Sequence, residues 1–80
     1  MSPGEIETIR ALHSPPYRRF VKRLVLARER AGLTQAEVAA ALARPQSFVA
    51  KCEAGQRRVD VVELQAFARV YKVPLEFFVK

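Results

Sequence analysis

Three side chains with hydrogen-bonding groups gather on one side of the segment 45–54. Projected as a helix at about 100° per residue, Gln46, Ser47 and Lys51 share an arc of about 140° with two alanines, and the other side of the segment is apolar. Glutamine can bond bidentately to adenine, and lysine can donate to guanine or to a phosphate. The small alanines leave room for close approach. The chemistry that this arc offers is therefore hydrogen bonding to base edges in the major groove of DNA.

Catalytic and metal-binding chemistry find little support in the sequence. The chain has one cysteine and one histidine, which excludes an internal disulfide and the usual cysteine and histidine sets for a metal ion. His13 and Ser14 are neighbours, but no second histidine and no convergent acid accompany them. Cys52 falls on the apolar side of its segment, where a thiol acts as a small hydrophobe. We expect no enzyme activity, no metal and no cofactor.

Composition places the chain among small basic domains. Its 80 residues can build one core, and 14 Lys and Arg against 8 acids leave a net charge of +6. This balance favours a polyanionic partner, with nucleic acid as the first candidate. The lone cysteine, the absence of an export signal and an apolar run no longer than 38–43 predict a cytoplasmic protein without a membrane partner.

Proline, glycine and capping residues divide the chain into short helices, and no alternating stretch with hairpin chemistry predicts strands. These signals predict five helices, over residues 15–31, 34–42, 45–54, 60–71 and 74–79. Ser14 is the expected N-cap of the first helix, and capping boxes are expected at Thr34 with Glu37 and at Asp60 with Glu63. Gly55 is expected to close the third helix in a left-handed conformation. The expected fold is all-α, a compact five-helix domain over residues 14–80. Residues 1–13 precede it as an N-terminal arm or a short helix.

Two details of these helices bear on how they pack. Pro45 suits the first position of the third helix, and Val61 is assigned to the inward face of the fourth. Arg28 interrupts the apolar face of the first helix, where an unpaired guanidinium is costly to desolvate. The sequence therefore predicts a carboxylate partner for Arg28 from elsewhere in the fold.

The opposite face of the first helix is basic. Its members are all cationic: Arg18, Arg19, Lys22, Arg23 and Arg30. This face projects from a helix that does not enter the groove in helix-turn-helix domains, so solvated charge is the simpler interpretation. It can still steer association electrostatically.

The second and third helices, joined by a short turn, form a helix-turn-helix arrangement within a small basic domain. The segment 33–55, LTQAEVAAALARPQSFVAKCEAG, resembles the Cro and phage-repressor helix-turn-helix family, often called Xre-like. The resemblance covers roughly residues 17–79. It implies a five-helix, lambda-repressor-like domain that binds double-stranded DNA as a homodimer on a two-fold operator.

The resemblance also implies roles for individual residues. The base-reading positions match Gln46, Ser47 and Lys51. The phosphate-binding positions match Gln35, Arg44, Arg57 and Arg58, with Gln35 also bracing the third helix. The family pairs an arginine of the first helix with the glutamate that ends the third, here Arg28 with Glu53.

One turn position departs from the family pattern. The residue after the second helix, usually glycine in the family, is Ala43 in this chain. If this position keeps a left-handed conformation, its Cβ costs about 1 to 2 kcal/mol. The departure bears on stability more than on function.

Two functions of different classes fit the sequence. The first is a sequence-specific DNA-binding transcriptional regulator, which dimerises through a second apolar stripe on the fourth helix and the chain end. The stripe comprises Val62, Ala66, Val70, Leu75, Phe78 and Val79. The alternative is an antitoxin or another protein-interaction module that neutralises a partner protein, with Leu26, Phe77 and Phe78 as exposed binding elements.

Overall fold

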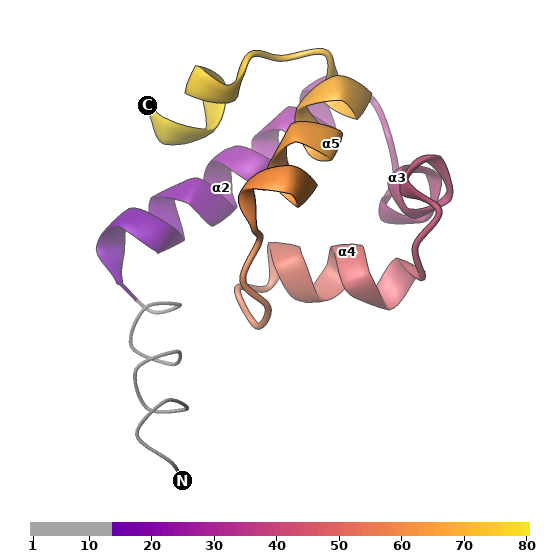
Figure 1. Ribbon diagram of the computed structural model, residues 1–80, viewed down its shortest axis with the longest axis horizontal. Coiled ribbons are helices and arrows are strands. Elements are labelled where there is room, and N and C mark those ends of the chain that lie inside the picture. The colour runs from indigo at the N-terminus through magenta and orange to yellow at the C-terminus, as the bar shows by residue number, and fades with distance from the viewer. Residues whose placement is uncertain (1–13) are drawn as a thin grey trace, which may run out of the picture.

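The computed structural model describes residues 14–80, and the segment predicted as an arm or short helix, residues 1–13, lies outside this part. The described chain is all-helical, with the elements α2 (Pro15–Arg30), α3 (Gln35–Leu42), α4 (Gln46–Glu53), α5 (Val61–Tyr71) and the 3-10 helix η1 (Leu75–Val79). Figure 1 shows η1 against α2 on one side of the molecule and α3 next to α4 on the other.

The prediction of five helices is wrong for the last element. The described residues form four α-helices, and the segment after Pro74 is a 3-10 helix. The Phe77 amide donates to the Pro74 carbonyl at 3.0 Å, which is a bond between residues three apart. The 3-10 form is common in short helical segments such as this one of five residues.

Side chains cap the starts of three helices as the sequence predicts. Ser14 caps α2. Thr34 Oγ1 accepts from the Glu37 amide at 3.1 Å, and Glu37 Oε1 accepts from the Thr34 amide at 2.9 Å. Asp60 and Glu63 form the same capping box at the start of α5, with bonds of 2.7 and 3.0 Å. Two capping boxes thus fix where α3 and α5 begin.

The start of α4 differs from the prediction by one residue. Pro45 is the N-cap and not the first helical residue, because its ψ of 150° is extended. Its missing N–H costs the helix nothing there. At the other end, Gly55 has φ +72°, so glycine closes α4 in the left-handed conformation that the sequence predicts.

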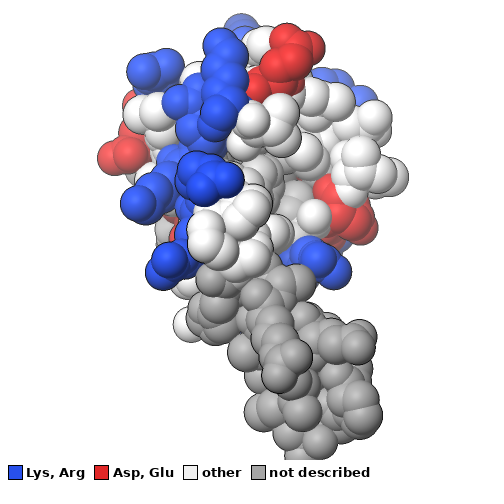
Figure 2. Space-filling view, turned by 90° about the vertical axis from the view of Figure 1, so that its left-hand side faces the viewer, with Lys and Arg blue, Asp and Glu red and all other residues white. Residues whose placement is uncertain are grey.

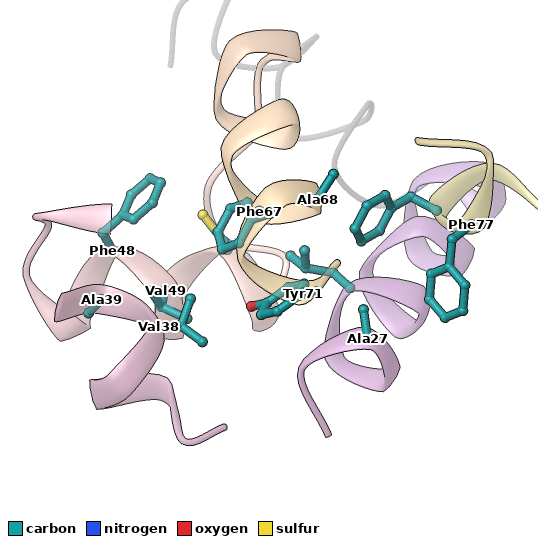
Figure 3. Packing of buried hydrophobic residues seen from close by; sticks show 12 residues of the cluster. Ala27, Val38, Ala39, Phe48, Val49, Phe67, Ala68, Tyr71 and Phe77 are labelled. Carbon is teal, nitrogen blue, oxygen red and sulfur yellow. The ribbon is translucent and has the colours of Figure 1, made fainter. Parts of the chain in front are cut away.

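The core lies among α2, α3, α4, α5 and η1, all of which contribute buried side chains. Leu24, Val49 and Phe67 are fully buried. The Phe67 ring stacks between Phe48 of α4, with centroids 6.0 Å apart, and Tyr71 of its own helix, at 5.8 Å. Figure 3 shows these rings lying between α4 and α5. This aromatic stack fixes the inner face of α4, so the outer face is left free for function.

Four side chains lie differently from their predicted positions. Val61 was assigned inward but is 65% exposed, because it begins α5 ahead of the turns that pack on the core. Leu26 was expected to be exposed but is partly buried against the core. Phe77 and Phe78 are also buried, because η1 folds back onto α2. The predictions of exposure for Leu26, Phe77 and Phe78 are wrong.

Ala43 adopts the left-handed conformation, with φ 55° and ψ 43°. Ala43→Gly is therefore expected to raise the free energy of unfolding by about 1 kcal/mol, since the Cβ strain exceeds the added entropy of a glycine in the unfolded chain. In a thermal melt, this stabilisation is expected to appear as a rise of roughly 4 to 8 °C in Tm. Ala31, the right-handed C-cap of α2 with φ −75°, is the control. Ala31→Gly removes no strain and is expected to lower Tm, and an equal rise in both variants would contradict the explanation.

Candidate nucleic-acid interface

The elements α3 and α4 form a helix-turn-helix unit. The turn begins at Ala43, whose amide donates to the Ala40 carbonyl at 3.1 Å, and the Arg44 amide donates to the Ala39 carbonyl at 2.9 Å. These bonds satisfy the last carbonyls of α3 and terminate it sharply. Pro45 then begins α4 in a new direction. Figure 1 shows α4 crossing below α3 at the edge of the molecule.

The outer side of α4 carries the three predicted base-reading residues. Gln46, Ser47 and Lys51 are exposed, whereas Phe48 and Val49 on the inner side are buried. Within residues 14–80 none of the three polar side chains is engaged in an ion pair or in a hydrogen bond. They lie on one exposed surface of one helix, and their contact with base edges stays a prediction.

A partly buried ion pair holds the far end of α4. Arg28 Nε lies 2.7 Å from Glu53 Oε2, and Arg28 Nη2 lies 3.0 Å from Glu53 Oε1. The Glu53 side chain is only 5% exposed, and its hydrogen bond to the guanidinium raises the pKa of Arg28 above its ordinary value. The carboxylate partner that the sequence demanded for Arg28 is therefore Glu53.

Glu53 also receives a bond from α3. The Gln35 side-chain amide donates to Glu53 Oε1 at 2.9 Å, so one carboxylate joins α2, α3 and α4. Gln35 therefore lies where it can brace α4, as the resemblance implies. Its bonding to phosphate stays a prediction.

A second acid, Glu63, holds two arginines at the opposite end of α4. Arg57 makes a two-bond fork to the Glu63 carboxylate, with both distances 2.8 Å, and Arg44 Nη2 lies 3.0 Å from it. Both guanidinium groups lie over the Phe48 ring, 4.3 Å from its centroid for Arg44 and 4.7 Å for Arg57. The bond from Arg57 is the main reason that the pKa of Glu63 is below its ordinary value.

The three predicted phosphate-binding arginines differ in how far contacts within the protein already occupy their guanidinium groups. The Arg57 guanidinium donates to the Glu63 carboxylate and, at 2.9 Å, to the Arg58 carbonyl. Arg57 therefore anchors the loop. Arg44 makes one such bond and keeps 44% of its side chain exposed. Arg58 is exposed and, within the described residues, has no ion-pair partner. Arg58 and Arg44 are therefore better placed than Arg57 to meet a phosphate.

Tyr17 fixes the same loop to α2. Its hydroxyl accepts from the Val59 amide at 3.0 Å and donates to the Arg57 carbonyl at 3.3 Å. Neither this contact nor the role of Glu63 beyond its cap emerged from the sequence. The partners of Glu63 lie 6 and 19 residues away along the chain, so no helical spacing connects them.

Other kinds of site are not seen in the described part of the chain. Residues 14–80 contain no group of three or more His, Cys, Asp or Glu placed to hold a metal ion. None of the described helices has the length and hydropathy needed to cross a bilayer. Cys52 is buried, and burial raises the pKa of its thiol.

Comparisons with known proteins agree with the arrangement of α3 and α4. A family model described as a helix-turn-helix domain matches residues 19–76. A solved structure described as an XRE-family like protein from Pseudomonas syringae pv. tomato str. DC3000 superposes with a TM-score of 0.77 and is 40% identical. The match covers 88% of this chain and 85% of that one. A search of curated proteins found no match.

Proposed function

The chain belongs to the Xre-like helix-turn-helix family of DNA-binding regulators, and from this membership we propose that it reads a specific operator with α4 in the major groove. The observation that carries the proposal is the free outer face of α4. Gln46, Ser47 and Lys51 project from a helix whose inner face is fixed by the core. Side chains held on a rigid element can select bases, since their positions do not adapt to the wrong one.

Phosphate contacts supply most of the affinity in this proposal. Arg58 and Arg44 border the two ends of α4, and the Gln35 amide lies at the start of α3. Such groups set the register of a protein on the duplex without reading the sequence. In this proposal α4 therefore selects the base sequence, and the residues around α4 anchor the protein to the phosphates.

The protein is proposed to act as a homodimer on a two-fold operator, with two copies of α4 about 34 Å apart in successive major grooves. Val62, Leu75 and Val79 are exposed apolar side chains available for such a contact. Phe78, which the sequence placed in the same stripe, is 1% exposed and is excluded from it. The alternative of an antitoxin-like module loses most of its support, because two of its three proposed binding elements, Phe77 and Phe78, are buried and Leu26 is partly buried.

Selection of bound sequences from a random duplex pool tests the proposal. Gln46→Ala is expected to relax the preference at one base pair, since one good side-chain pair contributes about 1 to 3 kcal/mol of discrimination. Arg58→Ala is expected to weaken binding to all sequences alike and to lower the slope of log affinity against log salt by about 0.9. The reverse pattern would show that the two residues have exchanged roles, and no selection at all would end the proposal.

A further inference from the structure

A basic surface runs along the outer side of α2. Arg18, Arg19, Lys22 and Arg30 are exposed, and Arg23 is half-buried between them. The five cations extend over thirteen residues of helix, or about 18 Å from first to last. Figure 2 shows lysine and arginine side chains gathered in a column on this side of the molecule. We call these five residues the α2 basic surface.

Most of the α2 basic surface faces away from α4, because four of its five cations lie about 120° to 180° around the helix from Arg28, and only Arg18 lies nearer, at about 80°. Arg28, which bonds to Glu53 of α4, is nine residues after Arg19. Nine residues correspond to about 900°, which places the two side chains on opposite sides of the helix. A duplex seated against the outer face of α4 is therefore separated from the α2 basic surface by the core. The proposed operator contact does not use these cations.

The charge of this surface is not neutralised by an ion pair within residues 14–80. Glu29 is the single acid in α2, and no described carboxylate pairs with Arg18, Arg19 or Lys22. The ion pairs of the described chain instead use Arg28, Arg44 and Arg57. Uncompensated cations along one helix face raise the local concentration of polyanions.

Part of the surface is held in place before any partner arrives. Arg23 Nε donates to the Phe77 carbonyl at 2.8 Å, and its guanidinium lies 4.0 Å from the centre of the Phe77 ring. The Arg30 guanidinium lies over the same ring at 5.6 Å. These contacts also cover Phe77, so the surface presents charge with little apolar area. Such a surface suits a phosphate backbone better than it suits lipid or an apolar protein partner.

We propose that the α2 basic surface binds the phosphate backbone of a second DNA duplex, so that one protein bridges two segments of DNA. Four of its five cations are arginines, whose planar guanidinium groups suit phosphate oxygens. The proposed contact is with phosphate oxygens, so it does not depend on the base sequence of the second duplex. Bridging rests on the proposed function, because α4 holds the first duplex, whereas the phosphate contact of the α2 basic surface needs no base reading by α4.

Bridging is tested by capture of a fluorescent duplex on beads that carry a second duplex. Arg19→Gln/Lys22→Gln removes two exposed charges of the surface and keeps the helix propensity high. Arg69→Gln/Lys72→Gln is the matched control, because it removes two exposed charges at the end of α5. We expect the first variant to reduce capture at least tenfold and the control to change it less than twofold. Unchanged capture by the first variant would overturn the proposal.

A second measurement separates this surface from α4. Ser47→Glu/Lys51→Glu places acids on the outer face of α4, so binding to a single duplex by that variant reports the α2 basic surface. Adding Arg19→Gln/Lys22→Gln to it is expected to lower the salt slope by about 1.8, or 0.9 for each charge. Failure of operator selection by the unmodified protein would not change this result. Binding of the α4 variant to phosphatidylglycerol vesicles but not to duplex would overturn the proposal and assign the surface to membranes.

Discussion

Glu53→Ala is expected to lower the free energy of unfolding by about 3 kcal/mol, near the lower end of what breaking a buried ion pair costs. The substitution removes three hydrogen bonds at once, two from Arg28 and one from Gln35. Arg28 then keeps only its bond to the Leu33 carbonyl at 2.9 Å. Because the Arg28 side chain is 18% exposed, water can reach part of the stranded charge and limit the loss.

Thermal unfolding measures this effect as a decrease of roughly 12 to 24 °C in Tm. Glu29→Ala is the control, because Glu29 is exposed and forms no ion pair in the described chain. It is expected to change the stability by less than about 0.5 kcal/mol. In a double-mutant cycle, Arg28→Ala/Glu53→Ala is expected to cost clearly less than the sum of the single variants. Additive costs would mean that the pair contributes little as a unit.

The ion pair also illustrates what the sequence could and could not predict. A charged residue inside an apolar helical face demands a partner, so periodicity alone identified Arg28 as paired. The identity of Glu53 came only through the family resemblance, since the two residues lie on different helices. The bond from Gln35 to the same carboxylate agrees with the bracing role that the resemblance implied. Helical periodicity therefore indicated that Arg28 needs a partner, and the tertiary structure shows that this partner is Glu53.

The helix boundaries were predictable because their signals are local. Ser14, Thr34 and Asp60 are capping residues, and the structure uses each of them as one. The type of the last helix was not predictable in this way, because proline opens α-helices and 3-10 helices alike. Pro45 shows the same ambiguity, since proline suits either side of the helix start.

Burial at the edges of elements was harder to predict than burial in their middles. Val61 continues the apolar pattern of α5 but belongs to its first turn, which extends past the core. Phe77 and Phe78 follow no long helix, so their burial depends on η1 returning to α2. Such returns are contacts between distant parts of the chain, and helical periodicity does not report them.

Ser47→Glu/Lys51→Glu is expected to weaken binding to the selected operator about a thousandfold, or roughly 4 kcal/mol. The change removes a cation that can donate to a base or phosphate, and it places two carboxylates where base edges and phosphates would lie. Both positions are exposed, so the fold is expected to survive. Equilibrium binding to the operator at several salt concentrations measures the loss of affinity, and a thermal melt shows whether the fold survives.

The matched control for this variant carries the same change in charge elsewhere. Gln65 and Lys72 are exposed on and just after α5, so Gln65→Glu/Lys72→Glu also makes the net charge more negative by three. If only long-range attraction mattered, both variants would lose affinity equally, because the total charge is the same. If α4 lies in the groove, the control loses about tenfold or less and keeps its base preference. Equal losses would therefore remove α4 from the interface even if the protein binds DNA.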